Sequence, residues 1–104
     1  MFLYRETVMA INDIKKITKH IKNLHSESEL ECFFKELLTE SEIETLSKRW
    51  RILELLQAGE SQRNIAKALQ VSLCKVTRGS KILKDKNSIL AKTLLKEITN
   101  EFKQ

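Results

Sequence analysis

The side chains best suited to chemistry in this sequence are cations that gather in one short segment. Residues 61–86 contain seven Lys or Arg and one Asp, whereas residues 1–60 contain nine basic and eleven acidic side chains. The formal net charge of the chain is +5, so this segment carries the whole positive excess. Such a local surplus attracts polyanions, and phosphate contacts from Lys and Arg supply much of the affinity for nucleic acid. The segment therefore predicts nucleic-acid binding; the alternative is a solvated pair of helices that is basic by chance.

The sequence contains no comparable cluster of residues for catalysis or metal binding. The cysteines and histidines, Cys32, Cys74, His20 and His25, show neither C-x-x-C nor H-x-x-x-H spacing. On a helix the two histidines, five residues apart, would point about 140° away from each other. No His, Cys or carboxylate constellation offers a nucleophile with a base, or a pair of acids. We therefore expect neither a metal site nor an enzyme.

The sequence predicts a cytoplasmic protein without a membrane segment. Charged residues follow the first methionine too early for a secretory signal. No apolar run approaches the roughly 20 residues that span a bilayer. Without export there is no basis for a disulfide, so both cysteines are expected to be reduced.

The composition predicts an all-helical fold in a single domain, residues 1–104. The chain has no proline and only two glycines, although β-rich folds need many sharp turns. A first helix over residues 3–24 carries apolar residues at every third or fourth position and would be about 33 Å long. A compact domain of this size has a radius of gyration of about 13 Å. We therefore expect this helix to extend beyond the domain and a second chain to cover its stripe; the alternative is a core helix with a frayed start.

Signals for helix ends divide the middle of the chain. The Ser-Glu-Ser-Glu run at residues 26–29 predicts the start of a short helix, and Thr39-x-x-Glu42 is a capping box that opens a longer one. Gly59 ends the longer helix as a left-handed C-cap, and we expect Trp50 in that helix to pack in the core. A last helix over residues 88–102 contributes Leu90, Leu94, Leu95, Ile98 and Phe102.

Residues 61–86 have the spacing of a helix-turn-helix. A helix over residues 61–69 is followed by a break, and Ser72 is a good N-cap for a second helix over residues 73–86. The predicted shared interior consists of Ile65, Ala66, Leu69, Val71, Val76 and Leu83. A major groove admits one helix, whose first turns contact base edges, while the preceding helix starts against phosphates. The residues predicted to contact DNA are Gln62, Arg63, Leu73, Cys74, Lys75, Thr77, Ser80, Lys81 and Lys84.

The middle of the chain resembles the bacterial tryptophan repressor family. The motifs that carry the resemblance are Leu38-Thr39 with Glu42, Leu46, Arg49, Arg51 and Ile52, then Gly59-Glu60, Ser61-Gln62-Arg63, and Thr77-Arg78-Gly79-Ser80 with Leu83-Lys84. They cover residues 36–86, and the last string is quite specific at this distance from Ser-Gln-Arg. The resemblance implies an all-α, six-helix intertwined homodimer. It also implies a repressor of tryptophan biosynthesis or uptake genes that binds operator DNA with L-tryptophan as corepressor.

The resemblance further implies a set of ligand contacts. By position these are Arg49, Arg78, Thr39, Leu38, Glu36, Gly79 and Ile82. The two arginine planes would lie on either face of the indole ring and one would hold the carboxylate, because a planar guanidinium can do both. Backbone carbonyls near residues 36 and 38 and the threonine hydroxyl would supply further polar contacts, and the glycine would let the backbone lie close to the ring. The alternatives are an ion pair of the first arginine with Glu42, Glu44 or Glu54, and a glycine that serves packing alone.

Three positions depart from the family's pattern. Ile82 stands where the family usually has a serine that helps to bind the ligand's amine, so recognition of the amino group does not carry over. The link between Gly59-Glu60 and Ser61 is one residue shorter, which can change the tilt of the helix-turn-helix. Lys75 replaces a small hydroxyl residue, so the operator sequence does not carry over. Two other functions stay open. One is a DNA-binding repressor that needs no ligand or senses another aromatic amine; the other is a helical protein-interaction dimer without a nucleic-acid role.

Overall fold

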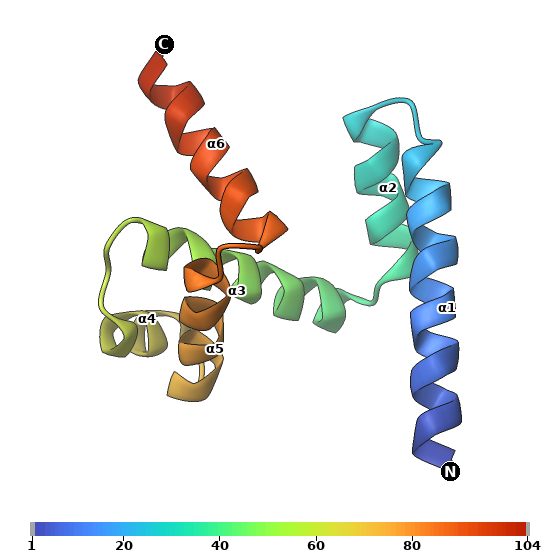
Figure 1. The fold of residues 1–104 in the computed structure, drawn as a ribbon, viewed down its shortest axis with the longest axis horizontal. Helices are drawn as coiled ribbons and strands as arrows, with labels where there is room; N and C mark the ends of the chain where they lie inside the picture. Colours follow the sequence, from blue (N-terminus) through green and yellow to red (C-terminus); the bar gives the residue numbers. More distant parts are fainter. Residues whose placement is uncertain (1, 104) are drawn as a thin grey trace. The chain divides into compact units, whose positions relative to one another are not determined.

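In a computed structural model the chain forms six α-helices and, within residues 2–103, no strand (Figure 1). The helices are α1 (Phe2–Lys22), α2 (Glu27–Leu37), α3 (Glu40–Gln57), α4 (Gln62–Leu69), α5 (Leu73–Lys84) and α6 (Ile89–Lys103). The structure describes the backbone of residues 2–103 and the side chains of residues 8–96. The prediction of an all-helical fold is confirmed for this part of the chain.

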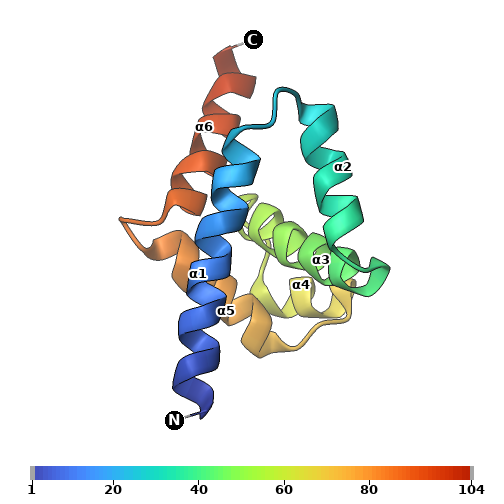
Figure 2. The ribbon, with the colours of Figure 1, turned by 90° about the vertical axis from the view of Figure 1, so that its right-hand side faces the viewer.

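The chain divides into two compact units, Met1–Glu40 and Ser41–Gln104. In the first unit α2 turns back and runs opposite to α1 (Figure 2). Ser26 caps α2 because its Oγ accepts a hydrogen bond from Glu29 N at 3.2 Å. Glu29 Oε2 in turn accepts from His25 N at 2.9 Å. These bonds satisfy N–H groups that a helix start leaves open, as the Ser-Glu run predicted.

The apolar stripe of α1 is uncovered up to Ile14, whereas Ile17 and Ile21 are half-buried. Val8, Ile11 and Ile14 are 39%, 50% and 61% exposed. None of the first unit's described side chains, residues 8–40, is buried. Burial of apolar surface is the main force that offsets the entropy lost on folding. Because the first unit buries so little apolar surface, we expect a further apolar surface to cover it. That a second chain provides this surface stays a prediction.

The second unit has a small core to which three helices contribute. Ile52 of α3, Ile65 of α4 and Val76 of α5 are 2%, 0% and 0% exposed. Around them pack the half-buried residues Leu55, Leu56, Ala66, Leu69 and Val71. The interior predicted for residues 61–86 is confirmed except at Leu83, which is half-buried and not part of this cluster. The core therefore joins α4 and α5 to each other and to α3.

Hydrogen bonds stabilise the connections from α3 to α4 and from α4 to α5. After α3, Gly59 adopts φ +91°, and Glu60 N donates to Leu55 O at 3.0 Å, which is the left-handed C-cap predicted there. After α4, Gln70 adopts the left-handed conformation (φ 55°, ψ 48°) and Val71 N donates to Ala66 O at 3.1 Å. Ser72 then caps α5, its Oγ accepting from Lys75 N at 3.4 Å. Both helix ends beside this three-residue connection are thus held by bonds within the chain.

Two expectations for the second unit are corrected. Trp50 is 39% exposed, and so is not a core residue of the described structure; Leu46, one turn earlier on α3, is 48% exposed. The apolar band of α3 is wider than α4 and α5 can cover, because they occupy only the side that carries Ile52 and Leu53. α5 ends at Lys84 instead of residue 86, where Asp85 adopts an extended conformation.

The last helix packs on α5. Leu94 is 3% exposed, whereas Leu90 and Leu95 are 36% and 58% exposed. The predicted contributions of Ile98 and Phe102 lie outside the described side chains. None of the helices within residues 2–103 has the combined length and apolar character needed to cross a bilayer.

Candidate ligand pocket and nucleic-acid interface

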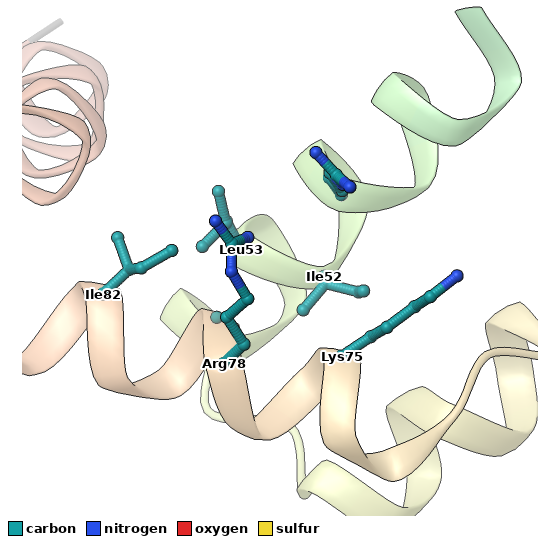
Figure 3. A pocket seen from close by; sticks show the side chains of 7 residues that line it. Ile52, Leu53, Lys75, Arg78 and Ile82 are labelled. Atoms are coloured by element: carbon teal, nitrogen blue, oxygen red, sulfur yellow. The ribbon is translucent and has the colours of Figure 1, made fainter. Parts of the chain in front are cut away.

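A pocket of about 100 Å³ lies between α3 and α5. Figure 3 shows Lys75, Arg78 and Ile82 projecting from one side of α5 toward α3, which contributes Ile52 and Leu53. The lining residues are Arg49, Ile52, Leu53, Lys75, Arg78, Gly79 and Ile82. Positions 75, 78 and 82 share one face because residues three and four apart are neighbours on a helix. Of the predicted ligand contacts, the structure therefore brings together Arg49, Arg78, Gly79 and Ile82.

At Gly79, α5 lies close to α3. A Cβ atom placed there would lie 3.0 Å from Ile52 Cγ2, 3.3 Å from Leu56 Cδ1 and 3.5 Å from Leu53 Cδ2. The first of these distances is too short for an ordinary van der Waals contact, and Ile52 is buried. The glycine thus permits the close crossing of the two helices, which is a packing role, and its backbone also lines the pocket.

Three positive charges line this pocket without a paired negative charge. Among the described side chains, none of Arg49, Lys75 and Arg78 has a carboxylate oxygen within 4.0 Å. Glu44, one of the partners considered for Arg49, pairs instead with Lys48 at 3.7 Å. The remaining lining is apolar apart from backbone. Such a pocket suits a flat apolar group that carries an acidic group, because guanidinium planes stack on rings and bind carboxylates.

A second pocket of about 270 Å³ adjoins the first and shares Arg49, Ile52 and Lys75 with it. Its full lining is Ser41, Glu44, Thr45, Lys48, Arg49, Ile52, Gln70, Val71 and Lys75. This lining is more polar than that of the first pocket, and it reaches the connection between α4 and α5. Lys75 therefore contributes to the walls of both pockets.

The other predicted ligand contacts belong to the first unit. Leu38 follows α2 and donates its backbone N–H to Phe34 O at 3.0 Å, Glu36 is exposed on α2, and Thr39 directly precedes α3. Neither pocket between α3 and α5 has any of these three residues in its lining. Their contact with a ligand stays a prediction.

Most of the residues predicted to contact DNA are exposed. This holds for Arg63, Leu73, Cys74, Lys75, Lys81 and Lys84. An open hollow of about 560 Å³ lies where α4 meets the start of α5, and it is lined by Arg63, Asn64, Ala66, Lys67, Val71 and Leu73. Ser80 differs from the exposed set because it is buried, with 9% of its surface exposed. Its contact with DNA stays a prediction that its burial does not favour.

Two of the predicted DNA contacts bond to each other. Thr77 Oγ1 lies 2.9 Å from Gln62 Oε1 and 3.0 Å from Leu73 O, so its single proton serves one of these acceptors at a time. Both side chains are half-buried. The bond to Gln62 links the second turn of α5 to the start of α4. Sequence reasoning missed this link because the residues are fifteen positions apart and no local motif marks the pair.

The described residues offer no sign of a metal site. No three His, Cys, Asp or Glu side chains among them are grouped so that they could hold a metal ion. Cys32 and Cys74 are both free and exposed.

Comparison with known proteins gives matches to one protein family. The model of the Trp repressor protein family matches residues 12–98 of the chain. The chain is similar to Trp operon repressor homologs of Xylella fastidiosa strains M23, Temecula1 / ATCC 700964 and 9a5c, each 49% identical over 59 residues. The similar region covers 56% of this chain and 60% of each homolog, so the chain spans less than two thirds of the length of these curated relatives. No solved structure matches the chain.

Proposed function

This chain belongs to the Trp repressor protein family, and we propose that it is a DNA-binding transcriptional repressor with L-tryptophan as corepressor. In the proposal α4 and α5 form a helix-turn-helix, and α5 is the recognition helix. The observation that carries the proposal is the division of α5 into two faces. One face, with Lys75, Arg78 and Ile82, lines a pocket, whereas Cys74, Lys81 and Lys84 are exposed outside that pocket.

The exposed cations support contact with DNA. Helix-turn-helix repressors, the Trp repressor among them, place the second helix in the major groove and use its N-terminal residues on base edges. Lys81 and Lys84 continue the basic face of α5, and Arg63 lies in the first turn of α4, where backbone N–H groups also favour phosphate. Leu73 and Cys74 are exposed at the start of α5, and in the proposal they touch thymine methyl groups.

The uncovered apolar surface supports a homodimer. Val8, Ile11 and Ile14 of α1 are exposed in the first unit, and Leu46 and Trp50 of α3 are exposed in the second. Contiguous apolar surface of this kind marks interaction sites. A twofold dimer presents two recognition helices, and binding to successive major grooves requires them to be about 34 Å apart, one turn of B-DNA.

The pocket supports a ligand that acts through the position of α5. It holds about 100 Å³, whereas sites for small molecules run from about 300 Å³ upward. The second unit alone therefore supplies part of a ligand site. Arg49 and Arg78 stack on the indole, and one of them binds the carboxylate. In the proposal α5 can adopt two positions, and L-tryptophan shifts the equilibrium between them. The size of that shift is limited by the difference between its affinities for the two positions.

The test is a mobility-shift measurement with and without L-tryptophan. Duplexes are first selected from a random pool by the protein, and sedimentation establishes its oligomeric state. We expect a dimer at micromolar concentration whose affinity for the selected duplex rises with L-tryptophan. Lys81→Ala should weaken binding, whereas Lys92→Ala, the same charge change on α6, should not.

Salt dependence measures the phosphate contacts directly. If Arg63, Lys81 and Lys84 of two protomers each neutralise one phosphate, the slope of log affinity against log salt is about −5, and it is about −7 if Lys75 also does. A slope near zero, or a monomer that binds no duplex in dilute buffer, would refute the DNA-binding function.

A second candidate ligand class follows from Ile82. Its side chain lines the pocket at the position where the resemblance implies help for the amine, and it has no hydrogen-bonding group. A repressor that senses another aromatic compound is therefore the alternative to L-tryptophan. Calorimetry with L-tryptophan, tryptamine and indole separates the two. If an arginine holds the carboxylate of L-tryptophan, tryptamine and indole should not bind, whereas binding of either would favour the alternative.

A further inference from the structure

The hydrogen bond between Thr77 and Gln62 joins two residues that sequence spacing assigned to the DNA interface. Thr77 Oγ1 on α5 lies 2.9 Å from Gln62 Oε1 on α4. Both side chains are half-buried, so this bond is partly shielded from water. Both residues also belong to the second unit, and the geometry of the bond is therefore independent of where the first unit lies.

Only the hydroxyl can supply the proton of this bond. An amide oxygen is an acceptor, the two donors of glutamine are both on Nε2, and threonine has a single O–H donor. The other acceptor near Thr77 Oγ1 is Leu73 O, at 3.0 Å. The oxygens of a DNA phosphate accept hydrogen bonds, so each of them would need the same proton. Thr77 therefore cannot hold Gln62 and donate to a phosphate at the same time.

The bond leaves one hydrogen-bonding group of Gln62 for a ligand. Oε1 is engaged, and within the described residues Nε2 has no hydrogen-bond partner. The terminal torsion of glutamine is broad and roughly twofold, so without a partner Oε1 and Nε2 can exchange places. A hydroxyl that donates to Oε1 selects one of the two orientations. In that orientation the remaining group is a donor.

The free amide group belongs to the end of α4 where the proposed function places a phosphate. Gln62 is the first residue of α4, directly after the N-cap Ser61, and Arg63 beside it is exposed. Glutamine side chains and helix N-termini are among the groups that contact phosphates in protein–DNA complexes. A phosphate oxygen can accept from Nε2 but not from Oε1, since both oxygens are acceptors. The orientation that Thr77 selects is thus the one that suits a phosphate.

We infer that Thr77 is a positioning residue of the DNA interface. Its hydroxyl holds the Gln62 amide with Nε2 free to donate to a DNA phosphate, and Thr77 itself does not contact DNA. This inference rests on the proposed DNA-binding function and replaces the direct contact predicted for Thr77 from the sequence. It also makes the phosphate contact of α4 depend on the position of α5, because the bond joins the two helices.

The test is a double-mutant cycle on DNA affinity, measured by fluorescence anisotropy with the full chain and the duplex that the protein selects. Thr77→Val keeps the shape of the side chain but removes the hydroxyl, and Gln62→Ala removes the amide. Each alone should weaken binding by about threefold to tenfold per protomer, the range expected for one neutral hydrogen bond. The double variant should bind as weakly as Gln62→Ala alone, because Thr77 acts through Gln62.

Three further measurements separate positioning from other roles of the hydroxyl. Thr77→Ser keeps the hydroxyl and should restore the affinity of the wild type. Thr93→Val removes a hydroxyl that lies 2.9 Å from Ile89 O within α6, and it should leave DNA affinity unchanged. Because phosphate contacts carry no direct sequence information, Thr77→Val should weaken binding to the selected duplex and to a random duplex by the same factor.

Gln62→Glu distinguishes the role of the amide at DNA from a purely structural link between α4 and α5. A carboxylate still accepts the Thr77 proton, so the link persists, but it has no donor for a phosphate. We expect Gln62→Glu to bind DNA more weakly than Gln62→Ala. The comparison is made at about 0.15 M salt, where exposed charges more than about 8 Å apart are largely screened. If the bond only held the helices together, Gln62→Glu would bind more tightly than Gln62→Ala.

The outcomes separate this inference from the function on which it rests. If the losses from Thr77→Val and Gln62→Ala add in the double variant, or if Gln62→Glu binds more tightly than Gln62→Ala, the positioning role is wrong and the proposed repressor stands. A loss confined to the selected duplex would show that Gln62 contacts a base, and the phosphate contact would be wrong. If the wild type binds neither duplex, the proposed DNA-binding function fails and the inference fails with it.

Discussion

Substitution of Gly79 by alanine tests the close contact between α3 and α5. Two effects oppose each other. Alanine is favoured over glycine within a helix by about 1 kcal/mol. The new Cβ, however, would lie 3.0 Å from Ile52 Cγ2 and 3.3 Å from Leu56 Cδ1, inside a core where Ile52 is 2% exposed. Overpacking of this kind costs about 1–3 kcal/mol. We expect a net loss of about 1 kcal/mol in the free energy of unfolding.

Urea denaturation at fixed protein concentration measures this change, because the stability of the proposed dimer would depend on concentration. In a thermal scan, about 1 kcal/mol corresponds to a lower Tm by about 4–8 °C for a domain of this size. Ile52→Leu removes the branch methyl that the Cβ would meet, so the double variant should recover part of the loss. We expect a coupling energy of about 1 kcal/mol between the two positions.

Gly59→Ala is the matched control. Nothing lies within 4 Å of a Cβ at position 59, but φ there is +91°. The cost should be about 1 kcal/mol from the backbone alone, and Ile52→Leu should not alter it. If Gly79→Ala instead raised stability by the full helix-propensity gain, the contact at Ile52 would not be tight and the packing role given to Gly79 would be refuted.

Two further substitutions test the connection between α4 and α5. Gln70→Gly should raise stability by about 0.5–1 kcal/mol, because Gln70 has φ 55° and glycine accepts that conformation without strain; Gln70→Ala should show no such gain in the same urea titration. Thr77→Val should cost about 0.5–1.5 kcal/mol through the lost bond to Gln62 Oε1 at 2.9 Å. Thr93→Val is its control, since the Thr93 hydroxyl lies 2.9 Å from Ile89 O of its own helix. Equal losses from the two threonines would show that the bond between helices contributes nothing.

Features set by neighbouring residues were predicted well. The caps at Ser26 and Ser72 and the left-handed Gly59 follow from side chains or backbone preferences within a few positions of the helix ends. The buried positions of α4 and α5 follow from helical periodicity, which fixes which side chains share a face. That Arg49 and Arg78 line the same pocket could be predicted only from the resemblance, because the two residues lie on different helices.

Features that depend on contacts between distant segments were not predicted. The exposure of Trp50 depends on which side of α3 is covered, and the burial of Ser80 depends on what packs behind α5. The position of Lys75 in the pocket could have been found from sequence, because it lies three residues before Arg78 on the same helix face. Because Lys75 is positively charged, it was predicted to contact DNA instead.

The two faces of α5 have a consequence for how such a protein can diverge during evolution. Pocket residues occupy positions 75, 78, 79 and 82, while residues 74, 81 and 84 are exposed and line neither pocket. Under the proposed function, mutations at one set change the molecule that is sensed, and mutations at the other change the DNA sequence that is bound. A lineage can therefore acquire a new signal for an old target, or a new target for an old signal, by separate steps within twelve residues. Lys75 is the position at which a single mutation would alter both.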